Sequence, residues 1–220
     1  MRIERPGVRT GYDLWAETYD ITPNPVVAID ARVTAAAVAA QAGERVLDAG
    51  CGTGRNLPGL LASGAAVVGM DFSSGMLAVA RRNHPDVPLV LADMQVGWPF
   101  RDGTFDVVLC ALVGEHLDRL AAVTREMRRV LAPAGRAVFS VYHPAMAEAG
   151  KEANFQHAGT EYRLGAVRHS LADYITAFEQ AGFTTIRVDE YSGDDDLARV
   201  EPVAAAFIGF PLLVVITGKA

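Results

Sequence analysis

Half of the 220 residues are hydrophobic, so the chain can bury a full core as one domain, residues 1–220. The formal net charge of −6 disfavours nucleic acid as a partner, because no basic stripe is present to release phosphate counterions, and a small neutral or cationic molecule fits better. The two cysteines lack the spacing of a disulfide framework or a metal site, so we expect no metal and a reducing compartment, the cytoplasm. No apolar run approaches the ~20 residues that cross a bilayer, so we expect no membrane partner. We expect a monomer or a homodimer.

Residues 1–42 predict a helical cover over the core. In the segment GYDLWAETYD, Tyr12, Trp15 and Tyr19 recur at a spacing that brings their rings to one face of a helix. The plainest interpretation is an aromatic stripe that caps the core. An alanine-rich stretch, residues 26–41, predicts a second helix, to which we assign a structural role only.

The stretch 45–71 has the order of one βαβ unit. An apolar run ends on Asp48, a glycine turn and a helical segment follow, and a second apolar run ends on Asp71. Glycines let a turn curl tightly and approach a ligand, and an acid at the end of the second strand can accept hydrogen bonds from a ribose diol. The pattern therefore predicts a site for a nucleoside-containing cofactor. The glycine turn contributes Gly50, Cys51 and Gly52 to this predicted site.

Charge indicates which nucleoside cofactor it is. A dinucleotide site has a small third residue in GxGxxG, but Arg55 stands at that position. A carboxylate at Asp48 would repel a pyrophosphate and attract a ligand that carries an ammonium and a sulfonium group. S-adenosylmethionine is such a ligand, with S-adenosylhomocysteine as its product. The alternative is that the glycines only make a tight turn.

The middle of the chain continues an alternation of strands and helices. A serine-capped helix with Met76 on its inner face follows Phe72, and residues 89–91 predict a strand that ends just before Asp93 and Met94. Residues 105–110 predict the central strand, which places Ala111 and Leu112 at its carboxyl end, where open α/β sheets bind ligands. The remaining expected elements are a helix at 115–131, a strand at 136–142, a helix at 171–180, strands at 184–188 and 212–217, and an exposed acidic loop at 194–196.

Residues 143–168 show neither helical nor strand periodicity. A loop of that length inside a compact domain is usually functional or disordered, and this one lacks the charge excess of a disordered linker. We therefore interpret residues 143–169 as a lid over the acceptor site.

Five segments together resemble the class I S-adenosylmethionine-dependent methyltransferases, particularly the small-molecule branch similar to the ubiquinone and menaquinone C-methyltransferases. They are VLDAGCGTGRN, GMDFSSGMLAVAR, LADM, FDVVLCALVGEHL and REMRRVLAPAGRAVFSV. The resemblance runs from Tyr12 to Thr217. It implies a Rossmann-like, doubly wound α/β fold, with a mostly parallel seven-stranded sheet, a last antiparallel strand and helices on both faces.

The resemblance also implies roles for individual residues. It places Tyr12 and Tyr19 near the methionine end of the cofactor, and Phe72 and Met76 near the adenine. It makes Asp93 the acceptor of the adenine amine.

Three histidines are candidates for a general base, which is needed only if the acceptor is a poor nucleophile. His143 is the first choice, because it follows a central strand at the ligand end of the sheet. His169 opens the helix after the lid. His116 occupies a position where the family often has histidine, frequently for packing and local hydrogen bonding.

We therefore expect methyl transfer to the O, N or C atom of a small organic acceptor, possibly in secondary metabolism. Two alternatives stay open. The chain could bind the cofactor only, or use the same fold for another reaction such as cyclisation. A nicotinamide oxidoreductase is disfavoured by Asp48 and Arg55.

Overall fold

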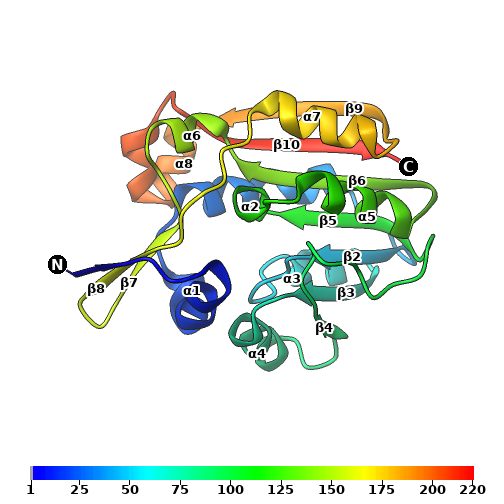
Figure 1. Cartoon of the computed structure of the whole chain (residues 1–220), viewed down its shortest axis with the longest axis horizontal. Coiled ribbons are helices and arrows are strands. Elements are labelled where there is room, and N and C mark those ends of the chain that lie inside the picture. The colour runs from blue at the N-terminus through cyan, green and yellow to red at the C-terminus, as the bar shows by residue number, and fades with distance from the viewer. Residues whose placement is uncertain (1) are drawn as a thin grey trace.

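A mostly parallel β-sheet organises the molecule (Figure 1). The computed structural model describes residues 2–220, and within that range seven strands lie in the order β4-β3-β2-β5-β6-β10-β9. Only β10 runs against its neighbours, pairing antiparallel with β6 and with β9. This confirms the predicted fold class. The strands are β2 (Arg45–Ala49), β3 (Ala66–Asp71), β4 (Leu89–Leu91), β5 (Phe105–Ala111), β6 (Leu131–Tyr142), β9 (Thr184–Ser192) and β10 (Pro211–Lys219).

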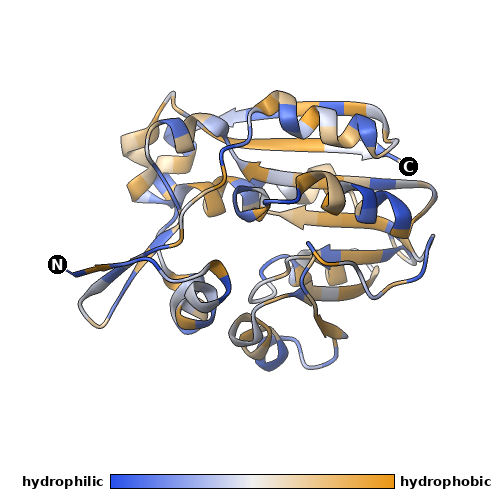
Figure 2. Ribbon diagram, viewed as in Figure 1, coloured by the Kyte–Doolittle hydropathy of each residue, from blue (hydrophilic) through white to orange (hydrophobic). Residues whose placement is uncertain are grey.

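Helices cover both faces of this sheet. Successive residues of β5 alternate between two apolar clusters, with Val107 and Leu109 in one and Val108 and Cys110 in the other. The first cluster packs under α2, α3 and α8, and the second under α5 and α7. Because both faces are buried, the central strands are hydrophobic along most of their length (Figure 2). The helices are α1 (Val8–Trp15), α2 (Pro25–Val38), α3 (Leu57–Ala62), α4 (Ser74–Asn83), α5 (Leu120–Val130), α6 (Pro144–Glu148), α7 (Leu171–Gln180) and α8 (Asp195–Val200), with 3₁₀ turns η1 (Ala16–Ile21), η2 (Gly114–His116) and η3 (Pro202–Phe207).

The strand order reverses between β2 and β5. From β2 the chain moves to β3 and β4 on one side, and from β5 it moves to β6 on the other. The loops that leave the carboxyl ends of β2 and β5 therefore diverge and open a crevice, which is where open α/β sheets bind ligands.

Residues 143–169 contain regular structure, so the expectation of a loop without it was wrong. They include α6 and a hairpin of β7 (Asn154–His157) and β8 (Thr160–Arg163), which pairs with β1 (Arg2–Glu4) in a second, three-stranded sheet. Four-residue strands are too short to show a clear alternation, and the partner strand lies at the other end of the chain. The Phe155 ring stacks on Trp15 with centroids 4.8 Å apart, so the hairpin and the N-terminal cover pack together.

Several other boundaries differ from expectation, and β6 and β9 are both longer than the strands expected at 136–142 and 184–188. The helix predicted from residue 115 begins at Leu120, because Glu115 and His116 belong to the separate turn η2. The acidic run 194–196 is not a loop but the start of α8. The Asp194 side chain accepts a hydrogen bond from the backbone N–H of Leu197, so it caps the helix. It also forms an ion pair with Arg32, which links α8 to α2.

Among the helices of residues 2–220, none is both long enough and apolar enough to span a membrane.

Candidate functional site

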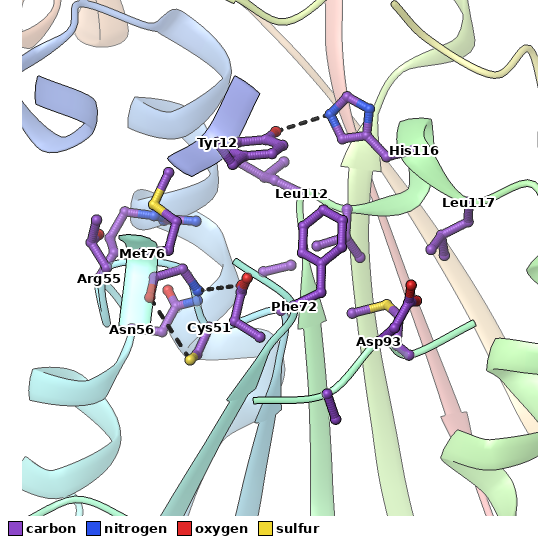
Figure 3. A pocket seen from close by; sticks show the side chains of 18 of the residues that line it. Tyr12, Cys51, Arg55, Asn56, Phe72, Met76, Asp93, Leu112, His116 and Leu117 are labelled. Carbon is purple, nitrogen blue, oxygen red and sulfur yellow. Dashed lines mark hydrogen bonds between the residues drawn. The ribbon is translucent and has the colours of Figure 1, made fainter. Parts of the chain in front are cut away.

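A cavity with about 800 Å³ of empty space lies at the carboxyl edge of the sheet, beside the crevice between β2 and β5. All of the predicted cofactor residues except Asp48 line it, and so does His116 (Figure 3). That these residues bind the cofactor stays a prediction. Sequence reasoning missed six further lining residues, all of which except Gln95 lie inside the segments that carry the family resemblance: Thr53, Asn56, Ala92, Gln95, Val113 and Leu117.

The glycine turn forms the floor of this cavity. The backbone N–H groups of Gly50 and Cys51 donate to the Met70 carbonyl at 2.7 and 3.0 Å, which ties the turn to the end of β3. Gly52 has φ +55°, and a Cβ there would meet no protein atom within 4 Å. Since Gly52 lines the cavity, its missing side chain leaves room for a ligand close to the backbone.

Opposite this turn, Leu112 follows β5 with φ +54°, a strained conformation for a residue with a branched side chain. Its backbone N–H donates to the Ser140 carbonyl at 2.8 Å, which holds the strained residue at the wall of the cavity.

Asp71 braces the turn from the end of β3. Its Oδ2 accepts the backbone N–H of Gly52 at 2.9 Å, and its Oδ1 accepts that of Ser73 at 2.8 Å. Burial raises the pKa of this carboxyl against the opposing effect of these hydrogen bonds. Asp71 lines the cavity, where a diol could donate to the remaining lone pairs of its carboxylate.

Asp48 lies beneath the turn and not at its mouth. The side chain is fully buried, and neither carboxyl oxygen has a hydrogen-bond partner within residues 2–220. Burial raises its pKa to about 7, because desolvation penalises the charged form. Its action on a ligand would therefore be through its field, and direct contact with the cofactor stays a prediction.

Arg55 joins the cavity to α2. One guanidinium nitrogen donates to Asp30 at 2.7 Å, while the other terminal nitrogen is buried and has no partner in the described chain. Asp30 is fully buried and also accepts from Thr34 and Ser140, so α2, to which we assigned a structural role only, positions a residue of the cavity. An acid inside an alanine-rich helix was the signal for this. The unpaired N–H groups of Arg55 suit a carboxylate, such as that of the methionine part of the cofactor.

Tyr12 forms the roof and meets His116 across the cavity. The Tyr12 hydroxyl and His116 Nε2 are 2.9 Å apart (Figure 3). Burial lowers the pKa of His116 to about 4, so this imidazole is neutral at pH 7. On the adenine side predicted from the resemblance, Arg9 lies over the Phe72 ring at 5.3 Å and pairs with Asp93 at 3.3 Å.

Comparisons with known proteins agree with this geometry. Residues 47–139 match the family described as the methyltransferase domain. The chain is 34% identical over 166 residues to a demethylmenaquinone methyltransferase of Streptomyces avermitilis, covering 73% of this chain and 68% of that protein. The chain belongs to the class I S-adenosylmethionine-dependent methyltransferases.

Two further comparisons bear on the extent of the likeness. A demethylmenaquinone methyltransferase of Beutenbergia cavernae is 38% identical over 136 residues, which are 60% of this chain and 56% of that protein. The chain therefore matches little more than half of that relative. The crystal structure of an S-adenosylmethionine-dependent methyltransferase from Mesorhizobium loti has a TM-score of 0.68 at 23% identity, covering 85% of this methyltransferase and 96% of that chain, which shows the shared fold.

The cofactor of this methyltransferase is S-adenosylmethionine. The residues of the cavity fit it. The space above Gly52, the unpaired nitrogen of Arg55 and the carboxylate of Asp71 match a ligand that brings a carboxylate, a ribose and an adenine to a narrow cavity.

The other two candidate histidines lie outside the cofactor cavity. His143 and His169 line a second, smaller cavity, on the side of η2 that faces residues 143–169. His143 Nε2 lies 2.7 Å from Glu190, and His169 Nε2 lies 2.7 Å from the Leu117 carbonyl. A catalytic role for either histidine stays a prediction.

Replacing Asp71 with alanine is expected to weaken binding of S-adenosylhomocysteine by at least about tenfold. The change removes the predicted ribose acceptor, and hydrogen bonds to a charged group contribute about 1.5–3 kcal/mol each. It also releases the Gly52 N–H, which loosens the turn. Titration calorimetry measures the affinity. Asp106→Ala is the control, because Asp106 also holds a strand end, through the backbone N–H of Arg45, but lies outside the cavity. An unchanged affinity in folded Asp71→Ala would place the ribose elsewhere.

Proposed function

We propose that this methyltransferase transfers a methyl group from S-adenosylmethionine to a small hydroxylated aromatic acceptor of the quinol type. The curated relatives named as demethylmenaquinone methyltransferases carry this proposal. The family match over residues 47–139 includes the glycine turn and the strand ends that border the cavity. The acidic net charge supports a small molecule in place of nucleic acid. The two cysteines are free and buried, which is consistent with the cytoplasm as the setting.

The chemistry requires positioning above all. The cofactor supplies a methyl group on a sulfonium sulfur, which is open to in-line attack from the opposite side. Tyr12 and Tyr19 close the cavity from the N-terminal cover, and the neutral His116 holds Tyr12 in place. Excluding water and aligning the acceptor in this way can contribute on the order of 7–11 kcal/mol to lowering a barrier. We propose that residues 143–169 complete this enclosure as a lid, because their hairpin packs on Trp15 of the cover.

Ligand stabilisation followed by product analysis tests the proposal. A ligand at 100 times its Kd stabilises a protein by about 2.7 kcal/mol, so S-adenosylmethionine should raise the melting temperature while NAD leaves it unchanged. Incubating 1,4-naphthoquinol with S-adenosylmethionine and the protein should then yield a product that mass spectrometry shows to be heavier than the quinol by one methylene unit. Stabilisation by the cofactor without methylation of any phenol or quinol would favour the alternative of binding or non-transfer chemistry.

A further inference from the structure

A buried carboxyl group beside the cofactor cavity has an oxygen that the protein does not use. Glu115, in η2, is 6% exposed, and its Oε2 has no hydrogen-bond partner among residues 2–220. Leaving a buried carboxyl oxygen unpaired costs free energy, so a group of this kind in a folded protein indicates a ligand or a chemical role.

Glu115 stands between the two cavities. His116, the next residue, lines the cofactor cavity, and its Nε2 is 3.9 Å from Oε1 of Glu115. Glu115 itself lines the second cavity, which is small and lies between η2, the end of β6 and residues 143–169. Tyr142, Met146 and Tyr174 contribute to its wall. Aromatic and thioether side chains of this kind suit a flat, apolar ring whose polar group points at Glu115.

One histidine of this second cavity, His143, is engaged at both ring nitrogens. The backbone N–H of Ala145 donates to His143 Nδ1 at 3.1 Å, which makes Nδ1 an acceptor and leaves the proton on Nε2. His143 Nε2 then donates to Glu190 at 2.7 Å, so neither ring nitrogen has a free lone pair. His169 uses Nε2 to donate to the Leu117 carbonyl, which makes its Nδ1 the acceptor nitrogen. Glu115 is thus better placed than His143 to accept a proton from a bound molecule.

We propose that the acceptor ring binds beside η2, against Tyr142, Met146 and Tyr174, and that Glu115 accepts the proton of its hydroxyl group. This inference rests on the proposed function. The O–H bond breaks, its electron pair stays on the acceptor oxygen, and the proton moves to Oε2. The oxygen, or the ring carbon that it activates, forms a bond to the methyl carbon, while the S–C bond breaks and its electron pair stays on sulfur. If carbon is the nucleophile, the proton on Glu115 returns to the oxygen, the hydrogen of that carbon leaves as a proton to the freed Glu115 carboxylate, and the aromatic ring is restored.

The electrostatic surroundings agree with this role. Burial raises the pKa of Glu115 to about 7, which suits a base at neutral pH. Asp30 raises it further, and the charge of Glu115 in turn contributes to raising the pKa of four tyrosines around it. The titratable groups around Glu115 include Tyr12 from α1, Tyr19 from η1, Asp30 from α2, His116 from η2, Tyr142 from β6 and Tyr174 from α7. His143, Lys151, Glu152 and His169 line the same cavity as Glu115.

Glu115→Gln tests the proposal, because it keeps the size of the side chain and removes the base. With 1,4-naphthoquinol as the probe, kcat should fall by about 10²- to 10⁴-fold, the usual contribution of a general base. Affinity for S-adenosylhomocysteine, measured by calorimetry, should stay within about twofold, because the cofactor cavity is unchanged. Glu44→Gln is the matched control. Glu44 pairs with Arg136 just before β2, at the opposite end of the sheet, so this variant should keep wild-type turnover.

Measuring kcat with a series of naphthols of increasing acidity shows whether Glu115 acts as a base or has only a structural role. More acidic acceptors need less help to ionise, so the loss caused by Glu115→Gln should shrink along the series. A structural role would give an equal loss for every acceptor. If Glu115→Gln does not fold, Glu115→Asp takes its place. The loss of kcat should then be smaller, and it should again shrink as the acceptor becomes more acidic.

Unchanged turnover, a loss that is independent of acidity, or a large loss of cofactor affinity would each overturn the role of Glu115. If the wild-type protein methylates no hydroxylated arene, the proposed function itself fails, and the inference fails with it.

Discussion

Gly52→Val should abolish cofactor binding while leaving the protein folded. A Cβ at Gly52 meets no protein atom within 4 Å, and the residue lines the cavity, so the valine side chain would occupy space that the cofactor needs. We expect the affinity for S-adenosylhomocysteine to fall by at least about 100-fold, equivalent to about 2.7 kcal/mol. The φ of +55° adds a second cost, because a β-branched residue is strained there by about 1–3 kcal/mol.

Gly43→Val separates these two costs. Gly43 has φ +84° and open space where a Cβ would lie, but it follows α2 and does not line the cavity. Both variants should lose a similar amount of stability in urea denaturation, whereas Gly52→Val alone should lose binding in calorimetry. Tight binding by Gly52→Val would show that this glycine does not face the cofactor.

Asp48→Asn is expected to stabilise the protein without cofactor, increasingly as the pH rises. A free aspartate has a pKa near 4, whereas that of folded Asp48 is about 7. Below pH ~4 the carboxyl is protonated in both states and burial carries no charge penalty. Between pH ~4 and ~7 the unfolded chain ionises while the folded one keeps its proton, so the wild-type free energy of unfolding falls relative to the variant. Above pH ~7 the difference is constant, with an upper bound of about 4 kcal/mol for three pKa units.

Urea denaturation of both proteins at pH 5 and pH 8 measures this difference. Asp106→Asn is the control of opposite sign, because hydrogen bonds from Arg45 lower the pKa of Asp106. That variant should lose stability by a similar amount at both pH values, since both lie above the pKa of the carboxyl in either state. If the gain in free energy of unfolding caused by Asp48→Asn did not grow with pH, burial would not be penalising the charged form of Asp48.

Local pattern was enough to predict the core of the fold and the floor of the site. The βαβ unit at residues 45–71 was readable because apolar strands, a glycine turn and strand-terminal acids all lie within about 25 residues of one another. The structure adds a contact that was not predicted, in which the Asp71 carboxylate accepts the Gly52 N–H.

Local sequence pattern did not predict the second sheet or the residues that surround the histidines. The strand β1 pairs with β8 across more than 150 residues, and no local period records such a contact. His143 was the first choice for the general base because it follows a strand at the ligand end of the sheet. In the structure its Nε2 lies 2.7 Å from Glu190 of β9, a contact that the sequence did not predict.

The sequence by itself determined the family, the sheet and the glycine turn that lines the cavity, because residue spacing carries secondary structure and short motifs. Only the tertiary structure decided which charged groups are buried and which are paired. Asp48 and Glu115 are ordinary acids in the sequence, and their raised pKa values and unused oxygens arise from the elements packed around them. Burial depends on neighbours distant along the chain, so the chemistry of a carboxyl group becomes visible only once the fold has brought those neighbours together.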